Sequence, residues 1–128
     1  MSAGSVSKQD LILTLKGKAS LNLELKRHLA PKTVGTVMRS IPIEGNAHMI
    51  GSSIAFMDTT IRAGGEKLRA HFKKGDIGFL ASNSSICFFI DDVSSMKPMT
   101  LIGKVTSNLE SLKDVKPGDV FTITQAGT

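Results

Sequence analysis

The sequence predicts one mainly β domain, a closed barrel of about eight strands with two short helices capping it. Short runs of residues either alternate apolar with polar or are apolar throughout, turn residues separate these runs, and helical periodicity is confined to short segments. The 128 residues suit a single core, with no internal repeat and no linker. We expect a flexible N-terminal tail over residues 1–9 and one barrel domain over residues 10–126.

The first two strands are expected to form a hairpin. Asp10 to Leu15 is a largely apolar run, and Lys16–Gly17–Lys18 is a turn in which glycine adopts a positive φ without steric cost. In the next run, leucines alternate with polar residues, which is the pattern of a strand with one solvated face. These leucines are Leu21, Leu23 and Leu25.

The first helix is predicted to begin at Pro31, because proline lacks the N–H that would be unpaired at the first helical position. Apolar residues at i, i+3, i+4 and i+7 then form one stripe. The stripe consists of Val34, Val37, Met38 and Ile41. Pro42 ends the helix, since the residue before a proline avoids the α region. An open end of the barrel is the expected packing partner of this amphipathic helix.

The segment after the helix is expected to be a loop followed by two strands. Ile43 to Gly51 contains two glycines and an asparagine, which are typical of turns. Strands are expected from Ile54 to Ile61 and from Glu66 to Phe72, on either side of a Gly64–Gly65 turn. In the second of these strands the expected inward side chains are Leu68, Ala70 and Phe72.

The centre of the fold is expected between Gly75 and Asp91, where two strand-like runs are joined by Ser82 to Ser85. The second run is apolar on both faces, so it must be covered on both, as in the middle of a sheet or in a barrel wall. One face carries Ile86, Phe88 and Ile90, and the other carries Cys87 and Phe89.

The C-terminal quarter predicts a polar excursion, a strand, a short helix and a closing strand. Asp92 to Pro98 is the excursion, and Met99 to Val105 is the strand. Asn108 to Lys113 suits one or two helical turns. Lys116 to Asp119 has proline and glycine at the two central positions, as a type II turn requires. Val120 to Thr124 then alternates as the last strand.

Composition narrows the classes of function. The single cysteine excludes an intramolecular disulfide and a zinc site built on paired thiolates, and we expect no cofactor and no metal. The net charge of +5 comes from scattered basic residues and is no nucleic-acid signature by itself. No apolar run approaches the roughly 18 residues of a membrane helix, and the N-terminus lacks the apolar core of a signal peptide. We therefore expect a cytoplasmic protein without membrane contact.

Three segments, in this order, resemble a cyclophilin. LELKRHLAPKTVGTVM, from Leu23 to Met38, resembles the strand that leads into the first cyclophilin helix. SICFFI, from Ser85 to Ile90, resembles the core strand SQFFI, and LIGKVTSNLESL, from Leu101 to Leu112, resembles a segment that begins VFGKV. The resemblance covers most of the chain and implies the cyclophilin-like barrel.

The resemblance is closer to the small uncharacterised cyclophilin-like proteins of bacteria and archaea than to the prolyl isomerases. The small proteins share the PKTV motif, a loop ending like Pro42–Ile43–Glu44–Gly45, and a strand led by a Gly–Asp pair like Gly75–Asp76. Their tryptophan–glycine pair is replaced here by Ile50–Gly51, so the resemblance does not imply a ligand shared with those proteins.

The cyclophilin resemblance also implies which catalytic residues are lost. In cyclophilins an arginine in a segment like FHRIIPGFMCQGGD assists rotation about the prolyl bond, and here Met49 follows the histidine instead. Cys87 replaces the glutamine of SQFFI, and the pocket tryptophan is absent because the chain has none. Phe89 alone carries over to a pocket position. Little or no prolyl isomerisation is therefore expected.

Our leading hypothesis is that the barrel binds a small molecule or an extended peptide in a groove near Phe89. The candidate ligand-binding residues are Phe89, Cys87, Arg62, Arg69 and His71. The alternative is that a strand or loop simply covers Phe89, and that the two arginines and the histidine are solvated surface residues.

Two other functions remain as hypotheses. The first is a divergent peptidyl-prolyl isomerase that uses Arg62 or Arg69. The second is binding of single-stranded nucleic acid, against which the absence of Tyr and Trp and the strand positions of the phenylalanines argue. A monomer or a weak homo-oligomer is expected.

Overall fold

The computed structural model describes residues 8–126, apart from the side chains of residues 95 and 96. Its strands are β1 Lys8–Leu15, β2 Ala19–Lys26, β3 Ile43–Ile50, β4 Ile54–Asp58, β5 Arg69–Phe72, β6 Asp76–Leu80, β7 Ser85–Phe89, β8 Val93–Val105 and β9 Val120–Gln125. Its helices are the 3₁₀ turn η2 Arg27–Leu29, the α-helix α1 Pro31–Ser40 and the 3₁₀ helix η3 Leu109–Asp114. The last two residues of the segment expected as a tail, Lys8 and Gln9, belong to β1, and residues 1–7 lie outside the described chain.

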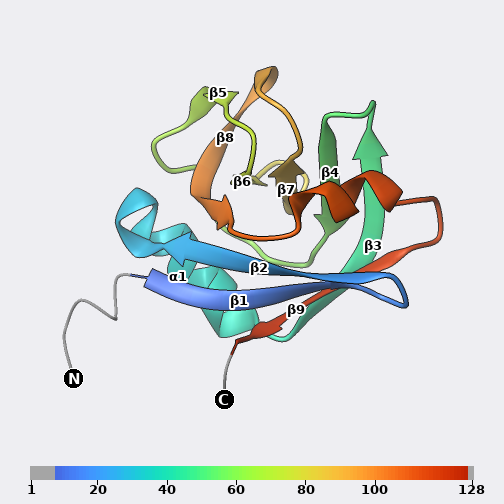
Figure 1. Cartoon of the computed structure of the whole chain (residues 1–128). Helices are drawn as coiled ribbons and strands as arrows, with labels where there is room; N and C mark the ends of the chain where they lie inside the picture. The colour runs from blue at the N-terminus through green and yellow to red at the C-terminus, as the bar shows by residue number, and fades with distance from the viewer. Residues whose placement is uncertain (1–7, 127–128) are drawn as a thin grey trace.

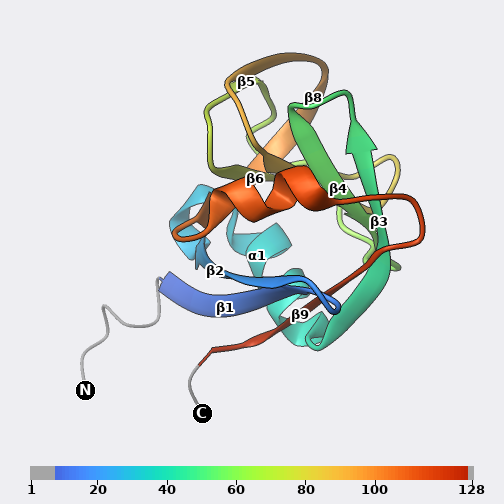
Figure 2. The same cartoon turned by 45° about the vertical axis from the view of Figure 1, so that its right-hand side comes forward.

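The strands form a closed antiparallel barrel, as expected (Figures 1 and 2). Eight of them follow the order β2-β1-β9-β3-β4-β7-β6-β8, and the pairing of β2 with β8 closes the ring. β5 is added outside this ring, on β8 alone. The β1–β2 hairpin and the left-handed Gly17 in its turn are confirmed.

The barrel interior is filled by aliphatic and aromatic side chains from every wall of the barrel. Leu21, Leu23 and Leu25 of β2 point into it as their alternation predicted. On β7, Ile86 and Phe88 do the same, and the Phe88 ring packs edge-on against Phe121 of β9 at a centroid distance of 5.5 Å. The helices add Val34, Val37 and Leu112.

Closure of the barrel requires close approach of two backbones. At the closing seam, Gly103 of β8 lies opposite Leu25 of β2 and also opposite Ile77 of β6. A Cβ atom on Gly103 would lie 2.1 Å from the Glu24 carbonyl oxygen, far inside van der Waals contact. Glycine is therefore required there by the packing of β2 on β8.

Helix α1 begins at Pro31 as predicted, but its N-terminus is capped from outside the helix. Ala30 precedes it and offers no capping side chain. Glu66, in the loop before β5, supplies the acceptors instead: Thr33 donates its N–H (2.6 Å) and its hydroxyl (2.7 Å) to Oε1, and Lys32 donates its N–H (3.3 Å) to Oε2. The Glu66 N–H is in turn bound to Thr100 Oγ1 of β8 at 2.9 Å. One loop residue therefore fixes the helix to the barrel.

Glu66→Gln is expected to lower the free energy of unfolding by about 1 kcal/mol near neutral pH, the usual effect of losing a helix cap. Although partial burial opposes ionisation, hydrogen bonds from Thr33 and Lys32 outweigh it and hold the pKa of Glu66 below its ordinary value. Stability from a lowered carboxyl pKa is present above the ordinary pKa and disappears as pH falls through the folded-state pKa. The difference between wild type and variant should therefore be constant from pH 6 to 8 and vanish in acid.

Urea unfolding followed by far-ultraviolet circular dichroism measures this difference, since the chain has no Tyr or Trp for intrinsic fluorescence. Glu110→Gln is the matched control, because Glu110 is an exposed glutamate in the first turn of η3. A Glu66→Gln protein as stable as the control at pH 7 would show that the cap contributes nothing.

Part of the expected strand pattern is wrong. Ile43 to Gly51 was predicted as a loop, yet residues 43–50 form β3, which pairs with both β4 and β9. The turn-like Gly45 has a different cause: a Cβ there would lie 1.8 Å from the Asp58 carbonyl oxygen. Asp92 to Pro98 was predicted as an excursion, but β8 begins at Val93.

The strands around the Gly64–Gly65 segment are shorter than predicted. β4 ends at Asp58, and β5 begins only at Arg69. Leu68, expected inside the core, is 59% exposed because it precedes the strand. Phe72, the last of the three residues expected inward, is buried, but in a cluster outside the barrel. Within residues 8–126, no helix is long and apolar enough to cross a membrane.

Candidate functional site

The second apolar face of β7 lies on the outside of the barrel, where β5 and β8 cover it. Phe89 is fully buried there, and Phe72 of β5 stacks on it with ring centroids 4.4 Å apart and planes 4° from parallel. Gly78 of β6 lies beside both rings, and a Cβ on it would make ordinary van der Waals contact with them, 3.4 Å from Phe89 and 3.5 Å from Phe72. The expectation that β7 is covered on both faces is confirmed.

Phe89 is therefore not the open floor of a groove. Of the two arrangements that the sequence allowed, the structure has the covered one, and Phe72 is the cover. The outer cluster that results consists of Ile54, Phe72, Cys87, Phe89 and Met99. A mostly apolar groove of about 360 Å³ lies beside this cluster. Ile54, Cys87 and Met99 belong both to the cluster and to the groove lining.

The groove lies over β4, β7 and the first half of β8. Its apolar lining consists of Ile50, Ile54, Phe56, Leu80, Cys87, Val93 and Met99. Polar groups lie among these residues, contributed by Asn83, Ser85, Ser94 and Lys97. An apolar lining with a few polar groups is the usual character of small-molecule sites, whose volumes are roughly 300–1,000 Å³.

Cys87 lies in the groove lining but does not supply a nucleophile. It is 2% exposed, and burial raises the pKa of its thiol to about 12. Only the thiolate attacks electrophiles, so a thiol of this pKa is inert at neutral pH. Cys87 contributes a small apolar contact at this position.

A histidine–carboxylate pair at the groove edge was missed by sequence reasoning. His48 Nε2 lies 2.7 Å from Asp58 Oδ2, and the imidazole stacks on Phe56, which lines the groove, at 4.8 Å. Register explains the arrangement, because His48 of β3 lies directly opposite Phe56 of β4. Met49, the residue expected to replace the cyclophilin arginine, packs toward the barrel core instead.

The two candidates on β5, Arg69 and His71, lie outside the groove. Both are exposed, and His71 Nδ1 lies 2.9 Å from the hydroxyl oxygen of Ser94, a groove residue. Arg69 lies opposite Met99 across the β5–β8 pairing. The structure thus brings Cys87 to the groove, leaves Phe89 under Phe72 and places the β5 side chains at the periphery.

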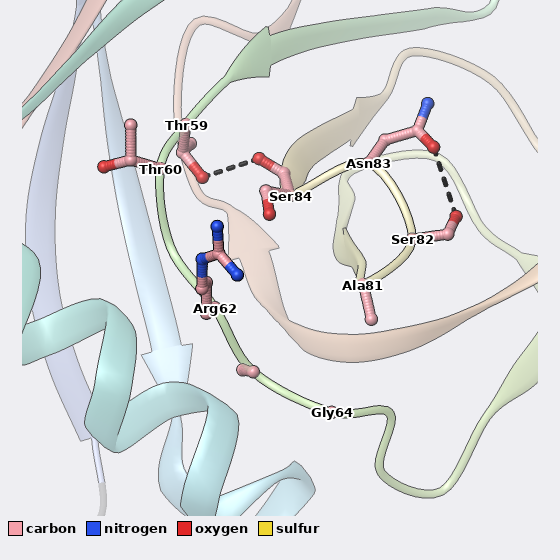
Figure 3. A pocket seen from close by; sticks show the side chains of 9 residues that line it. Thr59, Thr60, Arg62, Gly64, Ala81, Ser82, Asn83 and Ser84 are labelled. Carbon is pink, nitrogen blue, oxygen red and sulfur yellow. Dashed lines mark hydrogen bonds between the residues drawn. The ribbon is translucent and has the colours of Figure 1, made fainter.

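Arg62 lies in a second, polar pocket of about 860 Å³ (Figure 3). The chain after β4 forms one wall of this pocket, and the β6–β7 turn, residues 81–84, forms the other. Two hydrogen bonds join the walls: Thr59 donates its N–H (3.0 Å) and its hydroxyl (2.6 Å) to the Ser84 carbonyl oxygen. Asn83 borders both this pocket and the apolar groove, so the turn separates the two sites.

Within residues 8–126, no group of three or more His, Cys, Asp or Glu side chains is placed to hold a metal ion. The described side chains instead offer an apolar groove with polar groups among its lining, and beside it a pocket with a guanidinium. These features are suited to binding small molecules.

The fold is that of a small closed antiparallel barrel whose outer face carries a ligand-sized groove. The Cyclophilin-like family profile matches residues 9–124, and the chain belongs to this family. No curated protein matches the chain.

Two solved structures share the fold. The solution structure of the hypothetical protein AF2241 from Archaeoglobus fulgidus superposes with a TM-score of 0.79 at 22% sequence identity, over 94% of this chain and 96% of that one. The structure of McbB in complex with tryptophan superposes with a TM-score of 0.78 at 9% identity, over 92% of this chain but only 45% of McbB.

Proposed function

We propose that the protein binds a small molecule carrying one aromatic or branched apolar group in the groove lined by Cys87 and Phe56, with little or no catalysis. The observation that carries the proposal is the groove itself, a cavity of about 360 Å³ with mostly apolar walls. Filling it removes apolar surface of both partners from water, which is the main favourable contribution to such binding.

The polar groups of the groove give the ligand an orientation. Ser85 is buried on β7, Asn83 lies in the preceding turn, and Ser94 lies on β8, so hydrogen-bonding groups approach from two sides. A ligand with an apolar ring and one polar substituent fits this distribution. The alternative ligand for this groove is an extended peptide that places a single apolar side chain in it.

Indole and L-tryptophan are the first probes. McbB, which shares the fold, has been solved in complex with tryptophan, and the present chain has no Trp or Tyr, so indole fluorescence reports on the probe alone. We expect a saturable change in probe fluorescence. An N-acetylated tripeptide centred on tryptophan distinguishes the two kinds of ligand, since a peptide site binds it more tightly than the free amino acid.

Ile50→Glu and Leu68→Glu form a matched pair of variants, because both positions hold large exposed apolar residues and only Ile50 lines the groove. Ile50→Glu is expected to weaken probe binding at least fivefold, while Leu68→Glu binds as wild type does. Absence of saturable binding by all three probes, or equal binding by both variants, would overturn the proposal.

Prolyl isomerisation is the alternative function. The positions of three side chains argue against efficient catalysis of this reaction. Phe72 occupies the surface of Phe89 that a proline ring would need, Met49 packs toward the core, and Arg62 lies in the other pocket. A protease-coupled isomerisation assay compares wild type with Phe89→Ala. We expect both at the uncatalysed rate, and a wild-type rate well above that of the variant would establish the enzyme.

Binding of single-stranded nucleic acid is not expected, because the aromatic side chains are unavailable for stacking on bases. Of the six phenylalanines, only Phe56 is partly exposed, and the other five are buried. Single-strand binding proteins stack bases on exposed aromatic rings in a basic groove. A titration with single-stranded DNA and RNA at two salt concentrations checks this, with no binding expected even at low salt.

A further inference from the structure

We infer that the polar pocket around Arg62 is a binding site for a small oxyanion, the carboxylate or phosphate group of a metabolite-sized ligand. The first observation is an exposed cation, Arg62, whose guanidinium contacts solvent and pairs with no described protein group. Lys8, Lys16, Lys18 and Lys26 each have a carboxylate oxygen within 3.8 Å. Arg62 has no hydrogen-bond or ion-pair partner among the described residues, although it lines a cavity of about 860 Å³.

The second observation is the chemistry of the pocket lining. Apart from Arg62 it consists of Thr, Ser, Asn, Ala and Gly residues from the segment after β4 and from the β6–β7 turn, without a carboxylate. An oxyanion there meets hydroxyl and amide groups and no like charge. A guanidinium presents its N–H groups as a planar fork that matches two oxygens of a carboxylate or phosphate.

The third observation is that core packing and hydrogen bonds fix the walls of the pocket relative to each other. Ile61, next to Arg62, is buried in the barrel core, and its N–H donates to Thr59 Oγ1 at 3.1 Å. Thr59 also donates two hydrogen bonds to Ser84 across the pocket. The backbone that carries Arg62 is therefore anchored, which reduces the backbone ordering that a ligand must impose.

Ser84 supports the same assignment. Its φ of +52° lies in the left-handed region, where glycine would be less strained. Figure 3 shows the Ser84 side chain on the wall opposite Arg62, with the guanidinium between Ser84 and the chain leading to Gly64. Ser84 adopts this conformation although it carries a side chain, and its hydroxyl is placed to donate to an anion held by Arg62.

The test is a ¹H–¹⁵N NMR titration of the full chain with inorganic phosphate and, separately, succinate, at ionic strength held constant with sodium chloride. We expect saturable shifts confined to residues 59–64 and 81–84. Whichever anion saturates at the lower concentration identifies the oxyanion. Shifts that fail to saturate with both anions, or that scatter over the surface lysines, would overturn the inference.

Variants separate a built site from general attraction of anions to a basic protein. Arg62→Ala is expected to weaken binding at least tenfold, and Arg62→Lys by less, since it keeps the charge but loses the fork. Arg69→Ala is the matched control, an exposed arginine outside the pocket, and should bind as wild type does. Equal weakening by Arg62→Ala and Arg69→Ala would overturn the inference.

Ser84→Gly separates a ligand-binding role of Ser84 from a purely structural role of that residue. Because glycine relaxes the left-handed backbone, the variant should keep or raise the melting temperature while binding the anion more weakly. Unchanged binding would remove Ser84 from the site. Indole carries no anionic group, so failure of the groove and failure of the Arg62 pocket are distinguishable.

Discussion

Gly103→Ala is expected to lower the free energy of unfolding by about 3 kcal/mol, the upper part of the range for inserting atoms into a packed interior. The new methyl group would lie 2.1 Å from the Glu24 carbonyl oxygen and 2.9 Å from Leu25 Cα. Both are backbone atoms, so no side-chain rotation relieves the overlap. β2 and β8 must separate, which breaks the pairing that closes the barrel.

Urea unfolding monitored by circular dichroism measures this change. Gly64→Ala is the control, because Gly64 has no atom within 4 Å of an added Cβ. The control should differ from wild type by no more than about 0.5 kcal/mol, as is usual for surface positions. A Gly103→Ala protein within 1 kcal/mol of the control would show that the seam tolerates wider spacing. Amide exchange should also accelerate first at the β2–β8 pairing.

Phe72→Ala is expected to destabilise the protein and, at the same time, to strengthen the binding of indole in the groove. It removes a ring that is 3% exposed from the outer cluster, which should lower the free energy of unfolding by about 3 kcal/mol. It also uncovers Phe89, which otherwise lies under the Phe72 ring at 4.4 Å. The groove then gains an aromatic wall, and indole should bind at least threefold more tightly.

Leu68→Ala is the control for this variant, since Leu68 lies on the same segment and is 59% exposed. It should change neither stability nor indole binding measurably. If Phe72→Ala loses stability but binds indole as wild type does, the Phe89 surface is not continuous with the groove. If it gains prolyl isomerase activity, the β5 cover is what suppresses catalysis in this chain.

Local sequence signals predicted most of the barrel. The alternation of Leu21, Leu23 and Leu25, proline at the start of α1, and the left-handed glycine of the turn before β9 each depend on neighbours in the chain. These signals act over a few residues, so they can be read without knowing the fold. The resemblance to cyclophilins also rested on short motifs, and the profile match over residues 9–124 confirms the family.

Features that depend on distant residues were not predictable in this way. Gly45 resembles a turn residue, but it is needed because the Asp58 carbonyl approaches β3. The stacking of His48 on Phe56 requires knowledge of the β3–β4 register. The sequence predicted that Phe89 faces outward, but not that Phe72 would cover it, since only the folded arrangement brings β5 over β7.

The closing seam also bears on the order of folding. Leu23 to Leu25 of β2 meet Gly103 to Val105 of β8, and beside them Thr106 binds the carbonyl of Asn22, 84 positions away along the chain. The β1–β2 hairpin needs only a three-residue turn. Because closing a long chain segment costs more entropy than closing a short one, the hairpin should form early and the seam late. Until the seam forms, the edges of β2 and β8 are open to other chains, so folding yield should fall as protein concentration rises.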